Sequence, residues 1–167
     1  MSIGSLAQDA ADAALRGEAI SHAAALRLLR APDEDLRDLL LQAFRVRREA
    51  FGRKVKVCIL QNARSGLCPE DCHYCSQSAV STAEIPRYRL LSELELVKGA
   101  RHAVASGARR YCMVTSGRGP SERDIRHLSG ATRKIKEEFP DLEICLSLGL
   151  MSEPQARDLK AAGVECT

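Results

Sequence analysis

Three apolar segments alternate with helical segments in the later two thirds of the chain, and this alternation most constrains the fold. The segments 55–62, 108–116 and 142–150 are rich in β-branched and other apolar residues, which is typical of strands. The helices that we expect after these strands span 92–107, 120–138 and 152–163. Strands that alternate with helices predict an α/β fold with a parallel sheet and right-handed crossovers. An open doubly wound sheet and a (β/α) barrel both satisfy this pattern.

Local signals mark the ends of these elements. Ser92 and Glu95 form the Ser-x-x-Glu pattern of a capping box at the start of a helix, and Gly107 suits its end. A fourth strand is expected to begin at Val164, shortly before Thr167. A complete eightfold barrel takes about 250 residues. If the fold is a barrel, we therefore expect only its first three to four βα units here.

The first fifty residues predict a helical cap. The segment AISHAAALRLLRA is rich in Ala and Leu, and a proline follows it. The segment DEDLRDLLLQAFRVRREAFG has acidic residues in its first turn and arginines near its end, which suits the helix dipole. We therefore divide the chain into an N-terminal helical cap, 1–52, and an incomplete barrel domain, 53–167.

The composition excludes several classes of function. The chain has 167 residues, of which 45% are hydrophobic and 28% charged, and its formal net charge is +3. Such a mild charge gives no reason to expect a nucleic acid or an anionic membrane as a partner. No apolar run approaches the roughly 18 residues that a membrane helix needs. Because the first residues also lack the basic and apolar order of a secretory signal, we expect a cytoplasmic protein.

The stretch CPEDCHYC, residues 68–75, contains three cysteines with the spacing C-x3-C-x2-C. A structural zinc site usually takes four ligands in two separated pairs, and His73, between two of the cysteines, is poorly placed as the fourth. An iron–sulfur cluster fits better, because three thiolates leave one iron of a four-iron cluster open to a substrate or cofactor. The triplet also follows the first predicted strand, where the catalytic loops of a barrel lie.

The other four of the seven cysteines are scattered. Cys112 and Cys145 lie in the second and third predicted strands, where a buried packing role is the simplest interpretation. Adjacent parallel strands are about 4.8 Å apart, so two inward cysteines at one level can also share a cluster. Arg110 is on the face of Cys112, and a charged side chain inside a barrel needs a partner. We interpret Cys58 as buried strand packing, and Cys166 as packing or as part of a frayed end.

The triplet, with an aromatic residue before its last cysteine, resembles the signature of radical S-adenosylmethionine (radical SAM) enzymes. Three longer stretches resemble the biotin synthase family in particular, and the resemblance runs from about Asp35 to the end of the chain. These stretches are NARSGLCPEDCHYCSQS (62–78), YCMVTSGRGPSERD (111–124) and ICLSLGLMSEPQARDLKAAGV (144–164). The resemblance implies a TIM-type barrel of the radical SAM kind, of which this chain would contain the N-terminal part.

The resemblance also implies roles for individual residues. The ligands of a 4Fe-4S cluster, whose open iron binds S-adenosyl-L-methionine, would be Cys68, Cys72 and Cys75. The residues beside that cofactor would be Tyr74, at the adenine, and Thr115 and Ser116, at the methionine part. Two ligands of an auxiliary 2Fe-2S cluster, the sulfur donor, would be Cys112 and Cys145, with Arg110 close by. The remaining ligands and the substrate-binding asparagines of the family would lie beyond Thr167.

The activity implied by the resemblance is radical SAM sulfur insertion, which converts dethiobiotin into biotin. It further implies an electron donor such as flavodoxin or ferredoxin, and a homodimer in the full-length form. We expect the 167-residue chain alone to be inactive. The alternatives are another enzyme with the same triplet, either methylornithine synthase-like or hydrogenase-maturase-like, and a truncated metal-binding chain without catalysis. Lipoyl synthase is disfavoured because no second group of three cysteines precedes the triplet.

Overall fold

The computed structural model describes residues 2–167 and divides the chain into two compact units. The first unit runs to Val55, and the second runs from Lys56 to Thr167. This division lies close to residue 52, where the sequence pattern places it. Among the described residues, no helix has both the length and the apolar character that crossing a membrane requires.

The first unit is helical, as its sequence predicts. Its elements are α1 (Ile3–Leu15), α2 (His22–Leu29), the short 3-10 helix η1 (Asp33–Asp35) and α3 (Leu36–Phe51). Helix α1 packs against α3 and buries Leu6, Ala7 and Ala11. Apolar side chains of α3 such as Leu40 and Phe44 remain exposed.

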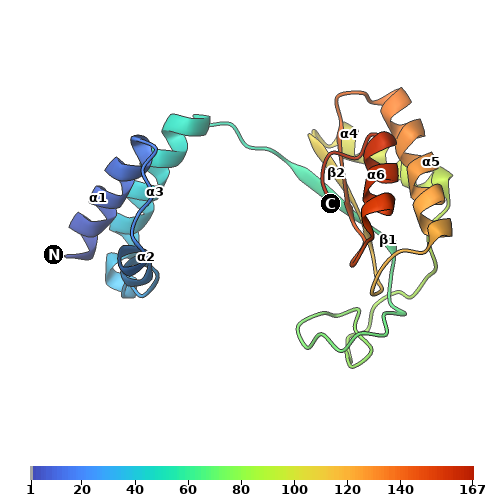
Figure 1. The fold of residues 1–167 in the computed structure, drawn as a ribbon, viewed down its shortest axis with the longest axis horizontal. Helices are drawn as coiled ribbons and strands as arrows, with labels where there is room; N and C mark the ends of the chain where they lie inside the picture. Colours follow the sequence, from blue (N-terminus) through green and yellow to red (C-terminus); the bar gives the residue numbers. More distant parts are fainter. Residues whose placement is uncertain (1) are drawn as a thin grey trace. The chain divides into compact units, whose positions relative to one another are not determined.

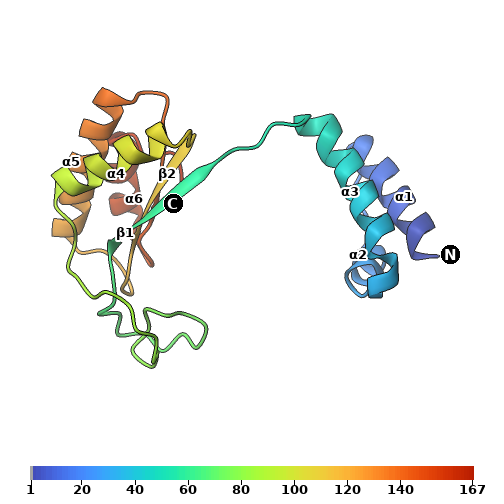
Figure 2. The same ribbon diagram turned by 180° about the vertical axis from the view of Figure 1, so that it is seen from behind.

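The second unit alternates strands and helices. Its elements are β1 (Cys58–Arg64), α4 (Glu93–Ala105), β2 (Arg110–Thr115), α5 (Glu122–Glu138), β3 (Glu143–Ser147) and α6 (Glu153–Ala161). The strands form one parallel sheet in the order β1-β2-β3, with α4, α5 and α6 on the same side of it (Figures 1 and 2). The α/β prediction is therefore confirmed, and the strands succeed one another in space as they do in the chain.

Each helix of this unit begins with a capping box. In each box the side chain of a serine accepts the N–H of the third helical residue, whose own side chain accepts the serine N–H. The pairs are Ser92 with Glu95, Ser121 with Asp124, and Ser152 with Gln155. The first pair is the one that the sequence pattern predicts. Because these caps satisfy backbone donors at the helix starts, they fix where each βα loop ends.

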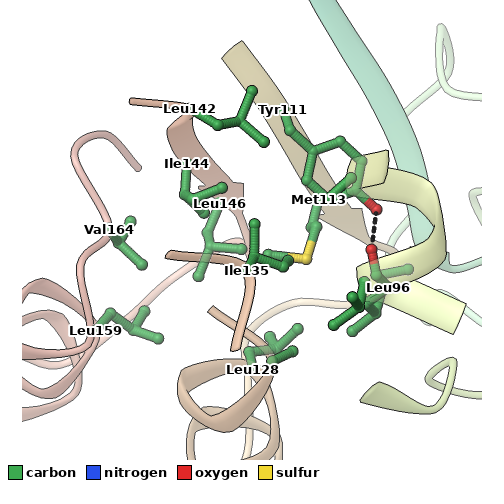
Figure 3. Packing of buried hydrophobic residues seen from close by; sticks show 14 of the residues in the cluster. Leu96, Tyr111, Met113, Leu128, Ile135, Leu142, Ile144, Leu146, Leu159 and Val164 are labelled. Atoms are coloured by element: carbon green, nitrogen blue, oxygen red, sulfur yellow. Dashed lines mark hydrogen bonds between the residues drawn. The ribbon is translucent and has the colours of Figure 1, made fainter. Parts of the chain in front are cut away.

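The hydrophobic core lies between the sheet and its helices (Figure 3). Alternate strand residues, among them Tyr111 and Met113, point into it and are fully buried. The hydroxyl group of Tyr111 lies 3.1 Å from the carbonyl oxygen of Leu96 in α4, so it is satisfied inside the core. Other fully buried members are Ala100, Ile125, Leu128, Ile135, Ile144, Leu146 and Leu159.

The predicted fourth strand is present only as a single bridge. After α6, Cys166 pairs with Cys145 of β3 in a parallel bridge. The N–H of Leu146 donates to the carbonyl oxygen of Cys166 over 2.9 Å. The segment that begins at Val164 therefore lies beside β3, in the position of the next strand of the sheet.

The two faces of the sheet should respond differently to substitution. Leu146 is fully buried on the helix-covered face, whereas Leu60 is 58% exposed on the other face. We expect Leu146→Ala to lower the free energy of unfolding by about 2–5 kcal/mol, because it leaves a cavity in the core. Leu60→Ala, the matched control, should cost well under half as much. Urea denaturation followed by circular dichroism measures both, and equal losses would show that the face of Leu60 is also packed.

Candidate metal centre

The cysteine triplet lies in a long loop, residues 65–92, that leaves the carboxyl end of β1 (Figure 1, green). Ser65 and Tyr88 close the base of this loop in an antiparallel bridge, with N–O distances of 3.2 and 3.0 Å. The loop therefore starts and ends at the same place beside the sheet. Since loops at the carboxyl ends of strands carry the active sites of (β/α) barrels, the triplet lies at the end where chemistry is expected.

Gly66 fixes the direction in which the loop leaves the strand. Its φ is 66°, in the left-handed region, and a Cβ atom there would lie 2.6 Å from Cγ of Arg87. Its N–H donates to Oε1 of Gln77 over 3.0 Å, and its carbonyl oxygen accepts a hydrogen bond from the hydroxyl of Ser116. One small residue thus connects β1, the returning part of the loop and the end of β2. The side chain that a substitution adds would disturb all three.

The three loop cysteines differ in exposure. Cys68 and Cys75 are half-buried, Cys72 is exposed, and all three are free thiols. The N–H of Cys75 donates to the carbonyl oxygen of Cys72 over 3.1 Å, which makes a tight turn between the last two members. The N–H of Ser78 donates to the carbonyl oxygen of Cys75 over 3.2 Å and continues that turn.

The donor chemistry of these thiols can be compared with what a cluster requires. Within residues 2–167, no group of three or more His, Cys, Asp or Glu side chains is arranged to hold one metal ion. A four-iron cluster makes a different demand, because each thiolate binds a separate iron and the sulfur atoms surround the cluster. Three free thiols on one loop at a partly exposed position match that donor chemistry. Cys68, Cys72 and Cys75 therefore remain the predicted ligands.

The residues predicted to contact S-adenosylmethionine lie around this loop. Tyr74 is 95% exposed, so its ring is free to stack against a ligand. Ser116 is buried, and its hydroxyl donates to the carbonyl oxygen of Gly66. Thr115 is also buried, and it lies on the same face of β2 as Tyr111. These contacts remain predictions.

A second group of thiols lies on the sheet face that the helices leave open. Cys112 of β2 is the register partner of Cys145 of β3, and Cys145 is the bridge partner of Cys166. The thiol of Cys145 is close enough to those of both neighbours to influence their pKa values. The sheet thus brings the two predicted inner-cluster ligands together and places a third cysteine beside them. We call Cys112, Cys145 and Cys166 the thiol row.

The thiol row is short of positive charge. Arg110, on the same face, pairs with Glu143 at 2.9 Å, and Lys56 also bonds Glu143. These hydrogen bonds, first from Lys56 and then from Arg110, lower the pKa of Glu143. Glu143 is therefore the partner that an inward Arg110 requires, a pairing that sequence analysis does not identify.

Burial is the main influence on the thiol row itself. It raises the pKa of Cys112, Cys145 and Cys166, although the charge of Arg110 acts in the opposite direction on each. Without a metal, these thiols are therefore protonated at neutral pH. Because metal ligands must be thiolates, metal binding here has to release protons.

Two expectations about the remaining cysteines are corrected. Cys58 is exposed rather than buried, because it starts β1 on the face that no helix covers. Of the two interpretations of Cys166, packing or a frayed end, the frayed end is wrong, since Cys166 is half-buried and bridges to Cys145. Nε2 of His127 in α5 lies 2.8 Å from the carbonyl oxygen of Leu91, so this histidine connects the helix to the end of the loop.

The comparison with family models decides the affiliation. The model of the Radical SAM superfamily matches residues 63–166. That range is more than half of the chain and contains the loop triplet and the thiol row. The chain belongs to the radical SAM superfamily.

Curated relatives of this radical SAM chain are named biotin synthase. One from Bacillus velezensis is 45% identical over 157 residues, which cover 94% of this chain and 46% of the relative. One from Nocardioides is 47% identical, and the match covers 93% of this chain and 41% of the relative. One from Magnetococcus marinus is also 47% identical, with 93% and 48% covered. The chain spans about half the length of the curated relatives it matches.

Two solved structures share the fold of this radical SAM chain. Methylornithine synthase has a TM-score of 0.76 at 24% identity, and the match covers 98% of this chain and 45% of that protein. HydG, a maturase of the FeFe hydrogenase, has a TM-score of 0.72 at 19% identity, and the match covers 96% of this chain and 36% of that protein. The similarity supports the expected radical SAM fold, with this chain forming part of the barrel.

Burial should make Cys112 slow to alkylate in the reduced, metal-free protein. Because burial raises its pKa, the thiolate fraction at neutral pH is smaller than that of an ordinary thiol with a pKa of about 8.5. We expect iodoacetamide to modify Cys112 at least several-fold more slowly than Cys58, the exposed control on the same face. The alkylation rate at Cys112 should rise with pH, and the midpoint of this rise should lie above the value of about 8.5 for an ordinary thiol.

Mass spectrometry of tryptic peptides separates the two cysteines, because 57–64 and 111–118 contain one each. Equal rates at neutral pH would contradict the burial of Cys112.

Proposed function

We propose that the protein which contains this chain is a biotin synthase, a radical SAM enzyme that inserts sulfur into dethiobiotin. The observation that carries the proposal is the register pair of Cys112 and Cys145, which places both side chains on the open face of the sheet. A sulfur-inserting enzyme needs such a second set of ligands, whereas a mutase does not. The names of the curated relatives support the same choice.

In this proposal the loop thiols hold a 4Fe-4S cluster. Cys68, Cys72 and Cys75 would provide its three thiolates and leave one iron for the amino and carboxylate groups of S-adenosyl-L-methionine. When bound, the cluster supplies the electron that cleaves S-adenosylmethionine and so permits radical chemistry at unactivated carbon. The exposed ring of Tyr74 would stack beside the adenine.

The chain's own residues prepare this site. Gly66 and Ser116 hold the base of the loop against the end of β2. The backbone turn from Cys72 to Cys75 keeps two ligands close in space. Thr115 and Ser116, at the end of β2, would lie beside the methionine part of the cofactor. The contribution of the protein is thus to position the reacting groups, as is usual for cofactor chemistry.

The inner thiols would hold a 2Fe-2S cluster that donates the sulfur. Cys112 and Cys145 would be two of its ligands, and Arg110 would lie close to it. Its other ligands and the contacts to dethiobiotin would come from parts of the protein outside this chain. For this reason we propose that the 167-residue chain alone makes no biotin.

We also propose the remaining partners. The reaction consumes electrons, so a small one-electron carrier such as flavodoxin or ferredoxin would reduce the loop cluster. A homodimer in the cytoplasm would be the working form. A mutase or hydrogenase maturase with the same triplet is the second candidate, favoured by the shared fold alone.

Anaerobic reconstitution with iron and sulfide should load the loop with a four-iron cluster. We expect a Mössbauer spectrum of four irons with one site that changes when S-adenosylmethionine is added. Cys72→Ala should abolish that cluster, because it removes an iron ligand, while Cys58→Ala should keep it. Stoichiometric, tightly bound zinc in place of iron would overturn this assignment.

The full-length protein tests the sulfur-insertion proposal. Cys112→Ala and Cys145→Ala should reduce biotin formation to background and preserve the loop cluster, because the two ligand sets lie on separate elements. Single substitutions of this kind cost about 0.5–3 kcal/mol, which a folded barrel tolerates. An anaerobic assay with dethiobiotin, S-adenosylmethionine and a reductant measures the product.

Cys58→Ala is the matched control in this assay, because it removes an exposed thiol from the same sheet face. If Cys112→Ala made biotin at the parent rate, the mutase-like candidate would become the better function.

A further inference from the structure

Cys145 and Cys166 are placed as the two halves of a disulfide. They are partners in a parallel bridge, and each thiol influences the pKa of the other. Paired residues of adjacent parallel strands have Cα atoms about 4.8 Å apart. This spacing lies within the roughly 4.4–6.8 Å that a disulfide spans. Both side chains lie on the open face of the sheet, so their sulfur atoms meet on one side.

We propose that Cys145 and Cys166 form a redox-active dithiol that closes reversibly to a disulfide when it reacts with a small-molecule disulfide such as oxidised glutathione. Neither the family resemblance nor the curated relatives' names give Cys166 a role. Its contact with Cys145 depends on the return of the chain after α6.

Cys112 is also paired in register with Cys145, but it is the poorer disulfide partner. Only 8% of Cys112 is exposed, and it lies within the continuous ladder between β2 and β3. In this chain Cys145 and Cys166 are both half-buried, so a small disulfide can reach them. A disulfide requires Cβ atoms about 3.5–4.5 Å apart, closer than the strand spacing. Small backbone movements are therefore needed, and these are easier at an isolated bridge than inside a ladder.

The backbone at Cys166 permits such a movement. Its N–H is 3.4 Å from the carbonyl oxygen of Ile144, at the long end of the range for hydrogen bonds. The neighbouring Glu165 is held more firmly, because its carboxylate accepts the N–H of Ile144 over 2.7 Å. The carbonyl oxygen of Cys166 is held by the N–H of Leu146 over 2.9 Å, so the movement is a shift on the N–H side. Cys166 can thus approach Cys145 while the preceding residue, Glu165, keeps the segment in place.

The reaction balances as two thiol–disulfide exchanges. The thiolate of one cysteine attacks the small disulfide RSSR, forms a mixed disulfide and releases one RS⁻, which takes up a proton as RSH. The thiolate of the other cysteine then attacks the protein sulfur of that mixed disulfide and releases the second RSH. The Cys145–Cys166 bond forms, the S–S bond of RSSR breaks, and two electrons pass from the protein to the small disulfide. The two thiol protons end on the released RSH molecules.

The consequence for the inner site rests on the proposed function. Cys145 cannot be a disulfide partner and an iron ligand at the same time. Oxidation would therefore remove one of the two inner-cluster ligands that this chain provides, and reduction would restore it. In this way Cys166 would make cluster assembly depend on the thiol–disulfide balance of the surroundings.

Peptide mapping of the cluster-free chain tests the dithiol directly. The protein is incubated with oxidised glutathione, remaining thiols are blocked in acid, and trypsin releases each open-face cysteine on a separate peptide. Those peptides are 57–64, 111–118, 137–157 and 161–167 for Cys58, Cys112, Cys145 and Cys166 in turn. We expect a linked pair of 137–157 and 161–167, lighter by two hydrogen atoms than the separate peptides and abolished by dithiothreitol.

Variants distinguish this linkage from general oxidation. Cys166→Ser should eliminate the linked pair and leave Cys145 as a free thiol or a mixed disulfide, while Cys58→Ser should leave the linkage at the parent level. A dominant link between 111–118 and 137–157, or only mixed disulfides with glutathione, would overturn the proposal.

A second measurement concerns iron. This measurement uses the full-length protein, which would supply the remaining ligands. Preoxidised protein should take up less iron at the inner site than reduced protein, and Cys166→Ser should remove that difference, as followed by iron analysis and the absorbance of the cluster. If the disulfide forms but neither protein takes up inner-site iron, the dithiol stands and the proposed cluster fails. If iron uptake is the same before and after oxidation although the disulfide forms, the dithiol stands and its control of assembly is wrong.

Discussion

The parallel register of β1, β2 and β3 determines both the core and the chemistry of the second unit. Successive side chains of a strand point to opposite faces, so one pairing register sorts every residue. The register that buries Met113 and Leu146 under the helices also places Cys112 beside Cys145 on the open face. A slip of one residue would exchange the two sets. Core packing, which strongly disfavours that exchange, therefore also keeps the thiol pair in place.

The loop triplet depends on a different constraint at the end of the same strands. Gly66 sits where β1 ends, and its backbone groups bond Gln77 and Ser116. Close by, Arg64 pairs with Asp124 at 2.7 Å, and Asp124 also accepts the N–H of Ser121 at the start of α5. The base of the loop that carries the three cysteines is thus connected to the sheet and to a helix start.

Sequence patterns predicted much of the second unit because its signals are local. The strand segments, the cap at Ser92 and the spacing of the triplet each depend on residues within a few positions of one another. The register pair of Cys112 and Cys145 was within reach, because both lie at corresponding points of adjacent predicted strands. The contacts of this cysteine pair, and the ligands that the loop binds, cannot be predicted from the spacing of residues in the sequence.

The features that sequence analysis missed are contacts between distant segments. Glu143 as the partner of Arg110 requires the exact neighbours of β2 and β3 to be known. The contact of Cys166 with Cys145 requires the path of the chain after α6. Cys58 was misjudged because an apolar strand looks buried on both faces, whereas only one face of this sheet carries helices. No periodicity in the sequence reports which face is covered.

The charges around the thiol row explain why its cysteines should be protonated when no metal is bound and should lose their protons only to a metal or a disulfide. Burial raises the pKa of Cys112 and Cys145, and each thiolate formed nearby makes the next more costly. Arg110 is the cation that acts on these thiols, but Glu143 already binds its guanidinium group. Two thiolates therefore lack sufficient countercharge from the described residues, and a metal can supply it by replacing the thiol protons. A disulfide is the other stable outcome when a small disulfide accepts two electrons, because both thiol protons are then lost and no charge remains. The same burial that keeps these thiols neutral when they are empty thus favours the metal-bound and disulfide states over free thiolates.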